Sequence, residues 1–281
     1  MASFDFTGKT ALVTGAGSGI GRNIALGLAK RGVRGLALCD IREDTVRETA
    51  SLAQALGAQV SVHVFDIADR SAIEALPGQV RDEHASIEVL VNNAGVTLGG
   101  HFDAGTIDEF EWVLTVNLLG VTRMTRVFLP QLKQAPAAQI INISSLFGLI
   151  GVPGQAAYCA SKFGVRGFSN ALIAELDQSN VGVTVVHPGG ISTEIANRAR
   201  MPASLTEEQL SKGRASANKL LVMPPQQAAE IILDAAARRQ ERVIVGRDAK
   251  IAALFERFFP VRTWQRLSAL SPKAKRASKP H

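Results

Sequence analysis

Ile140-Ile-Asn-Ile-Ser-Ser-Leu-Phe-Gly148 begins the segment that decides the fold of this chain, residues 140 to 177. A turn rich in glycine and proline follows, and then Tyr158-Cys-Ala-Ser-Lys162. The pattern predicts a buried strand that ends on serines and a long helix that begins near the tyrosine. Because helix residues four positions apart share a face, Tyr158 and Lys162 should project together over the end of the strand.

A phenol beside an ammonium suits proton transfer with an alcohol or a carbonyl compound. Free tyrosine ionises near pH ~10, and a neighbouring cation is expected to lower its pKa toward the neutral range. Ser145, at the carboxyl end of the strand, can donate a hydrogen bond to the substrate oxygen. A Tyr-x-x-x-Lys pair also arises by chance on amphipathic helices, so the interpretation depends on the rest of the chain. Tyr158 is the only tyrosine, and no other tyrosine competes for the role.

A glycine-rich loop follows the first predicted strand, residues 10 to 14, and leads into a helical pattern over residues 23 to 31. Glycines let the backbone turn tightly and approach a pyrophosphate, whose charge is favoured by the amides at the start of a helix. The loop therefore predicts a dinucleotide site with contacts from Gly15, Gly17, Ser18, Gly19, Ile20 and Gly21.

Asp40 ends the second predicted strand, residues 35 to 39, close to twenty residues beyond the loop. A carboxylate there can accept hydrogen bonds from the adenosine ribose hydroxyls, whereas a 2′-phosphate at ~4 Å would be repelled by roughly 4 kcal/mol at an effective dielectric near 20. NAD is therefore the predicted cofactor. NADP is the alternative, because Arg42 or Arg22 could reach a phosphate.

Three further strand ends carry polar or small residues. Asp66 and Ile67 follow the third strand, residues 60 to 64, and are expected to contact the adenine, although Asp66 and Asp69 also suit helix caps. Asn92, Asn93, Ala94 and Gly95 follow the fourth strand, residues 89 to 92. A sixth strand, residues 182 to 187, ends at Pro188. Strands alternate with crossover helices throughout, which predicts an α/β fold with a doubly wound parallel sheet and helices on both faces.

These motifs together resemble the short-chain dehydrogenase/reductase family, over about residues 6 to 246. The resemblance rests on the glycine loop, Asn92-Asn-Ala-Gly95, Asn117 within a predicted helix from 108 to 132, Ser145 with Tyr158 and Lys162, and Pro188-Gly-Gly-Ile-Ser-Thr193. It implies a Rossmann-type sheet of seven strands, with residues 242 to 246 as the last strand.

The resemblance also implies roles for individual residues. Tyr158 is the general acid and base, Ser145 holds the substrate oxygen, Lys162 lowers the tyrosine pKa and binds the nicotinamide ribose, and Asn117 fixes a water that leads from Lys162 to solvent. Further cofactor contacts are expected from Asn93, Ala94, Gly95, Pro188, Gly189, Ile191 and Thr193. Members of the family usually form dimers or tetramers through the helices that contain Asn117 and Tyr158, and a homo-oligomer is expected here.

The substrate side is predicted to be apolar. Residues 194 to 225 lack a clear strand and lie where the family has a mobile lid. Leu146, Ile150 and Val152 are expected to line the cavity or to pack under that lid, and substrate contacts are predicted for Ser145, Phe147, Leu149, Gln155 and Tyr158. We therefore expect a secondary alcohol or ketone of long-chain, isoprenoid or steroid-like character.

Composition favours one α/β domain, residues 1 to 248, with an extension over residues 249 to 281. The chain has 281 residues, 46% of them hydrophobic and 20% charged, and it lacks a leader-like start and a span-length apolar run, so a cytoplasmic protein is expected. The two cysteines lack partners at ligand spacing, and no metal site is predicted.

The net charge of +6 comes largely from residues 238 to 281, which argues against a nucleic-acid face on the body. In the extension, apolar residues recur at helical spacing among lysines and arginines. Such a segment can lie on an anionic membrane, or it can pack on the body or on a partner subunit. Its last part, residues 273 to 281, is predicted to be disordered.

Three functions follow from these patterns. The first is an NAD-dependent alcohol dehydrogenase and ketone reductase, and the second is an NADPH-dependent carbonyl reductase. The third is a non-catalytic protein that senses the cofactor or acts as a scaffold, against which the complete set of catalytic residues argues.

Overall fold

Seven strands form one parallel sheet in the computed structural model, which describes residues 3–201 and 206–269. The strands are β1 (Thr10–Thr14), β2 (Gly35–Asp40), β3 (Gln59–Val64), β4 (Val89–Asn92), β5 (Ala138–Ile143), β6 (Val181–Pro188) and β7 (Arg242–Val245). Their order is β3-β2-β1-β4-β5-β6-β7, and all neighbours pair in parallel. The predicted seven-stranded Rossmann-type fold is thus confirmed. The order reverses between β1 and β4, which is where such sheets bind nucleotides.

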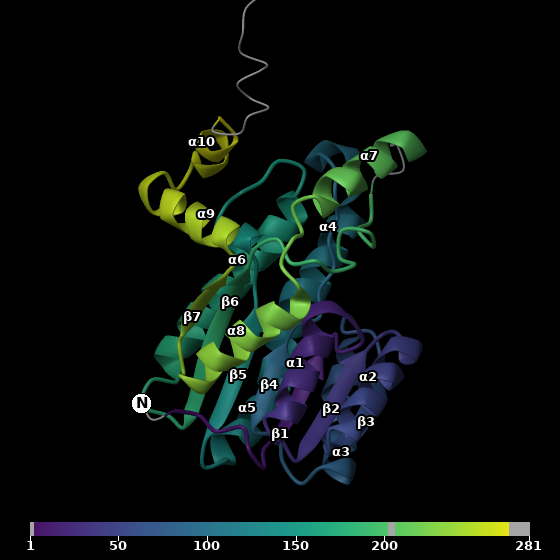
Figure 1. Cartoon of the computed structure of the whole chain (residues 1–281), viewed down its shortest axis with the longest axis vertical. Helices are drawn as coiled ribbons and strands as arrows, with labels where there is room; N and C mark the ends of the chain where they lie inside the picture. Colours follow the sequence, from purple (N-terminus) through teal and green to yellow (C-terminus); the bar gives the residue numbers. More distant parts are fainter. Residues whose placement is uncertain (1–2, 202–205, 270–281) are drawn as a thin grey trace, which may run out of the picture.

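Helices cover both faces of the sheet (Figure 1). On one face, α1 (Gly19–Lys30), α2 (Glu43–Ala55) and α8 (Pro225–Ala237) share an apolar core with the strands. On the other, α3 (Arg70–Glu83), α5 (Gly120–Gln134) and α6 (Ala156–Glu175) share a second core with them. The five inner strands are buried along nearly their whole length, as expected for a parallel sheet, whereas the edge strands β3 and β7 are partly exposed. The carboxyl ends of the strands form the edge where the site lies.

The helix predicted over residues 108 to 132 is interrupted. The chain forms α4 (Ile107–Leu114), a π-helical turn (Thr115–Leu119) and then α5. Such turns often occur at functional sites, and Asn117 lies in this one. Short 3-10 turns occur at Phe102–Ala104 and Leu146–Gly148.

The segment after β6 and the extension pack beside the carboxyl edge of the sheet. Isolated bridges join Ile191 to Met223 and Leu98 to Arg200. Helix α7 (Glu207–Asn218) lies within the segment of residues 194 to 225 that was predicted to be a lid. The extension forms α9 (Arg247–Phe258) and α10 (Thr263–Ala269), while the end predicted to be disordered lies outside the described residues. Among the described helices, none has the length and apolar character to cross a membrane.

Candidate active site

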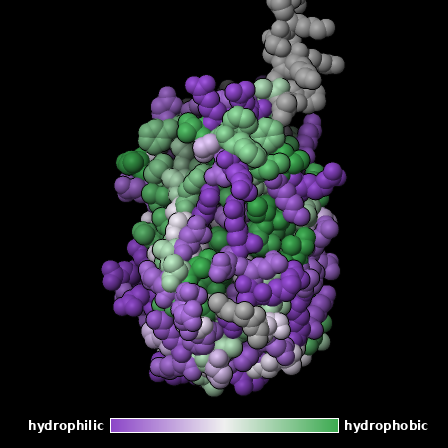
Figure 2. Space-filling view, turned by 90° about the vertical axis from the view of Figure 1, so that its left-hand side faces the viewer, coloured by the Kyte–Doolittle hydropathy of each residue, from purple (hydrophilic) through white to green (hydrophobic). Residues whose placement is uncertain are grey.

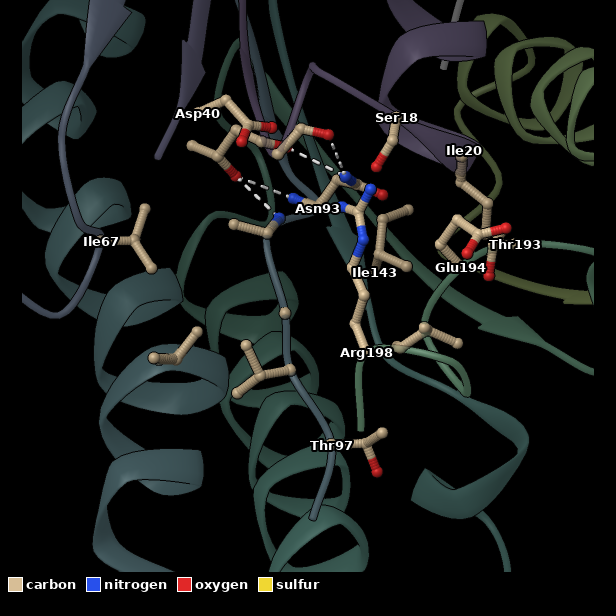
Figure 3. A pocket seen from close by; sticks show the side chains of 18 of the residues that line it. Ser18, Ile20, Asp40, Ile67, Asn93, Thr97, Ile143, Thr193, Glu194 and Arg198 are labelled. Atoms are coloured by element: carbon tan, nitrogen blue, oxygen red, sulfur yellow. Dashed lines mark hydrogen bonds between the residues drawn. The ribbon is translucent and has the colours of Figure 1, made fainter. Parts of the chain in front are cut away.

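A cavity of about 420 Å³ lies at the carboxyl edge of the sheet (Figure 3). Its wall includes most of the predicted cofactor residues, and three of the four predicted catalytic ones. Those present are Gly15, Ser18, Gly19, Ile20, Asp40, Arg42, Asp66, Ile67, Asn93, Ala94, Gly95, Ser145, Tyr158, Lys162, Pro188, Gly189, Ile191 and Thr193. The cavity wall does not include Gly17, Gly21 or Asn117, but each of them contacts residues that line it.

The glycine loop has the backbone that only glycine adopts easily. Gly15 and Gly19 have positive φ angles of 64° and 55°. A Cβ atom on Gly21 would collide with the Gly15 carbonyl oxygen, so this glycine lets α1 pack closely against the turn. Asn93 ties the loop to β4, because its Nδ2 donates to the carbonyl oxygens of Thr14 at 3.0 Å and Gly15 at 3.1 Å (Figure 3).

Asp40 is held by two backbone amides. The Gly17 N–H donates to its Oδ2 at 2.8 Å, and the Arg42 N–H donates to its Oδ1 at 3.0 Å. A carboxylate has about four acceptor positions, so acceptor capacity is left for ribose hydroxyls. The side chain therefore shapes the loop and faces the cavity at once.

The two arginines that could favour a 2′-phosphate are both paired with carboxylates. The Arg22 Nη2 lies 2.7 Å from Glu48 Oε2, and its Nε donates to the Gly17 carbonyl at 3.1 Å. The Arg42 Nη2 lies 3.0 Å from Asp44 Oδ2. A phosphate would have to compete with these carboxylates for either guanidinium.

The side-chain amide of Asn117 forms hydrogen bonds with both backbone groups of Val96, in the segment after β4, much as a neighbouring strand would. Its Oδ1 accepts from the Val96 N–H at 2.8 Å, and its Nδ2 donates to the Val96 carbonyl at 2.9 Å and to Ser161 Oγ at 3.0 Å. The π-helical turn is what brings the buried amide into this register. Asn117 thus joins the cavity wall at Val96 to the helix that carries Tyr158.

The two serines at the end of β5 differ in role. The Ser144 hydroxyl donates to the Lys162 carbonyl at 2.9 Å, which fastens the strand end to α6. A Cβ atom on Gly148 would collide with this hydroxyl. Ser145 instead interacts with the Tyr158 phenol, and it is the serine that the spacing singled out.

The pKa values of the tyrosine and lysine depart from expectation. Burial raises the pKa of Tyr158 to about 12, although the hydrogen bond with Ser145 acts in the opposite direction. Burial lowers the pKa of Lys162 to about 8. The Lys162 Nζ donates to the Ile143 carbonyl at 2.9 Å and lies 5.7 Å from the centre of the tyrosine ring. Burial is therefore the largest influence on the pKa of the phenol in this structure, and the lowering of that pKa by Lys162 stays a prediction.

The substrate wall was predicted less well. Leu149, with Ile150, is buried against Ala252 of the extension, so its assignment to the cavity is corrected. Phe147 packs edge-on against the Tyr158 ring, with 6.0 Å between ring centres, and is not part of the cavity wall. Gln155 does not line the cavity but contacts a residue that does: its Oε1 accepts a hydrogen bond from Thr97 Oγ1 at 2.9 Å.

Other residues form that wall instead. They are Val96, Thr97, Trp112, Val116, Ile143, Glu194, Ile195, Arg198, Arg200 and Leu221. Arg198, in the segment predicted to be a lid, extends into the cavity toward Asn93 and Ser18 (Figure 3). Arg200 stacks on Trp112, with its guanidinium carbon 3.5 Å from the ring centre. The position of these arginines in the predicted lid was the available signal. Among the described residues, no cluster of His, Cys, Asp or Glu could hold a metal ion.

A dinucleotide loop at the switch point of a parallel sheet, beside a half-buried serine and tyrosine and a buried lysine, is typical of nicotinamide-dependent oxidoreductases. Comparison with known proteins gives the family. The family model described as short chain dehydrogenase matches residues 9–203, and the chain belongs to this family.

Relatives and solved structures agree with this assignment. The chain is 41% identical over 271 residues to the protein named "Putative oxidoreductase SadH" from Mycobacterium tuberculosis, covering 96% of each chain. It is 34% identical to a 3-oxoacyl-(acyl-carrier-protein) reductase, FabG, from Thermotoga maritima, covering 73% of this chain and 82% of that one. A short chain dehydrogenase/reductase from Burkholderia phymatum, crystallised in complex with NAD, has a TM-score of 0.83 at 30% identity, covering 90% of this chain and 94% of that one.

Proposed function

We propose that this enzyme interconverts an apolar secondary alcohol and its ketone with NAD as the hydride carrier. The observation that carries the proposal is the placement of Ser145, Tyr158 and Lys162 in one cavity with the glycine loop. Val96, Val116, Ile143, Ile195 and Leu221 give the same cavity an apolar side, which supports a substrate of long-chain, isoprenoid or steroid-like character.

The residues present fit a dinucleotide. Gly15 and Gly19 have no side chains that would cover the backbone amides of the loop. A Cβ atom added to Gly19 would lie 3.0 Å from the methyl group of Thr193. Asp40 would hold the adenosine ribose, and Asn93 to Gly95 with Pro188 to Thr193 would hold the nicotinamide half. When bound, the cofactor supplies hydride acceptance or donation at its nicotinamide ring.

The chain itself handles the proton. With a pKa of about 12, the Tyr158 phenol is protonated at neutral pH and is a ready donor to the oxygen of a ketone undergoing reduction. In the oxidation direction the same oxygen accepts the alcohol proton, which becomes easier as the pH rises. Ser145 donates a hydrogen bond to the substrate oxygen in both directions, and Lys162, protonated below about pH 8, places a positive charge beside the phenol.

Two observations favour NAD over NADP. Asp40 points its carboxylate into the site (Figure 3), and both nearby arginines are paired with carboxylates of their own. The NADPH-dependent carbonyl reductase is the second candidate, and it would require Arg22 or Arg42 to leave its carboxylate partner and bind the 2′-phosphate.

We infer further that the protein works as a homo-oligomer in the cytoplasm. Leu119 and Phe163 are exposed apolar side chains beside Asn117 and on the tyrosine helix, the two elements expected at the subunit contact. Changing both to serine should lower the apparent mass in light scattering. An unchanged mass would move the contact elsewhere.

The function is tested by incubating the enzyme with NAD and a panel of secondary alcohols: short aliphatic, long aliphatic, isoprenoid and steroid. We expect NADH absorbance to appear, with kcat/KM rising with apolar size. No turnover of any member with either NAD or NADP, from protein that binds NADH, would favour the non-catalytic, cofactor-sensing role.

A further inference from the structure

The extension has one face that packs on the body. Ala249 and Ala252 of α9 are buried, and Ala252 contacts Leu149 and Ile150. Thr263 anchors α10 and is also buried. These contacts fix the orientation of the extension, so its opposite face is defined.

That opposite face carries a row of unpacked apolar side chains. Ile251, Leu254 and Phe258 recur at spacings of three and four, so they share one side of α9, with exposed fractions of 52%, 58% and 67%. Val261, 89% exposed, follows in the connection between α9 and α10. We call these four residues the outer apolar row. Figure 2 views this side of the molecule and shows apolar surface interleaved with hydrophilic side chains in its upper half.

The free charges around the row are basic. Lys250, Arg257 and Arg262 are exposed, and Arg266 lies over the Phe259 ring at 5.2 Å. The acidic side chains of the extension are engaged with the body. Asp248 Oδ2 accepts from the Gly190 N–H at 2.7 Å, and Glu256 pairs with Arg166 at 3.4 Å.

The sequence concentrates charge in the same region. Residues 247 to 281 contain nine lysines and arginines against two acidic residues, whereas the whole chain has a net charge of +6. The remaining 246 residues are therefore nearly neutral, with a net charge of −1. The basic character belongs to the extension and not to the catalytic body.

We propose that the outer apolar row docks this protein onto the surface of an anionic lipid membrane. An apolar row bordered by lysine and arginine gains both from burial at the headgroup boundary and from attraction to acidic lipids. A second copy of this chain is a poorer occupant, because a twofold contact would place the same cations opposite one another. The proposed contact is peripheral, because it involves only the exposed side of α9 and the residues next to it.

Docking would also orient the active site. α9 packs on the segment that follows Ser145, and Asp248 binds Gly190 in the segment after β6. The membrane contact and the cavity therefore share supporting residues. The docking inference itself does not depend on the proposed substrate.

The test is co-sedimentation of the full chain with two kinds of vesicle. One contains phosphatidylcholine alone, and the other contains equal amounts of phosphatidylcholine and phosphatidylglycerol. We expect the protein to pellet with the anionic vesicles, to stay in the supernatant with the neutral ones, and to be released by salt. Protein that stays in the supernatant with both kinds of vesicle would overturn the proposal.

Paired variants identify the surface. Leu254→Ser with Phe258→Ser should weaken binding by roughly tenfold per side chain, and Arg257→Gln with Arg262→Gln by roughly fivefold per cation. The matched apolar control is Leu52→Ser with Leu56→Ser, exposed apolar residues in α2 and directly after it. The matched basic control is Arg47→Gln with Arg70→Gln, exposed arginines of the body. Equal losses in the controls would overturn the proposal. So would a fall in oligomer size of Leu254→Ser/Phe258→Ser without lipid, which would assign the row to a second copy.

Discussion

Replacing Asp40 by serine should remove most of the preference for NADH over NADPH. The carboxylate accepts two loop amides at 2.8 and 3.0 Å and keeps acceptor capacity for the ribose. Serine removes the charge while keeping a small polar group at the end of β2. The loop will lose some order, so the ratio of the two dissociation constants is the informative quantity.

The size of the effect follows from two terms. Hydrogen bonds from ribose hydroxyls to a carboxylate contribute about 1.5–3 kcal/mol, so NADH should bind roughly ten- to a hundredfold more weakly. A 2′-phosphate ~4 Å from the carboxylate is repelled by roughly 4 kcal/mol at an effective dielectric near 20. Relief of that repulsion changes the ratio by about a thousandfold before relaxation, and we expect a change of at least tenfold.

The assay is titration with NADH and NADPH, following energy transfer from tryptophan, because Trp112 lies in the cavity wall. Asp66→Ser is the matched control. It removes the same charge from the same cavity, yet the Asp66 carboxylate is turned to the Ala68 N–H at 2.8 Å. The reasoning is refuted if Asp40→Ser and Asp66→Ser change the ratio equally, or if the unmodified protein binds NADPH more tightly.

Three other predictions concern the lid, the π-helical turn and the lysine. Arg198→Gln should weaken NADH binding roughly tenfold and reduce its salt dependence, since a guanidinium in the cavity suits the cofactor diphosphate. Arg200→Gln removes the cation stacked on Trp112 and should leave the salt dependence of NADH binding unchanged. The same titration at two ionic strengths distinguishes the two variants. Asn117→Ala should lower the free energy of unfolding in urea by about 2–4 kcal/mol, because it leaves the backbone groups of Val96 unpaired; a loss below about 0.5 kcal/mol would mean that the amide pairing contributes little. The rate of ketone reduction should be constant below about pH 8 and fall above it, because Lys162 loses its charge there while Tyr158 keeps its proton. A rate that stays constant up to pH ~10 would mean that the charge of Lys162 does not contribute to it.

Elements with strong local patterns were predictable from sequence. The strand at Thr10–Thr14 and the loop after it have a buried run followed by glycines, and the structure places both where the pattern did. Ser145 and Tyr158 come from neighbouring elements, and their meeting follows from strand and helix geometry alone.

Features that depend on distant parts of the chain were not predictable. The π-helical turn places Asn117 against the backbone of Val96, a partner from another element. The sequence indicates that an apolar residue such as Leu149 is buried. It does not indicate whether that residue packs against the extension or lines the cavity. The raised pKa of Tyr158 reflects the depth of burial, which only the assembled fold defines.

The most direct test of the proposed function compares the unmodified enzyme with Tyr158→Phe. Both are to be titrated with NADH and then assayed with NAD and the best alcohol of the panel. We predict that NADH binding stays within about threefold while kcat falls by roughly 10²–10⁴, because the variant keeps the ring but lacks the proton-transfer group. Turnover by Tyr158→Phe at the rate of the unmodified enzyme would contradict the assignment of the proton transfer to this cavity.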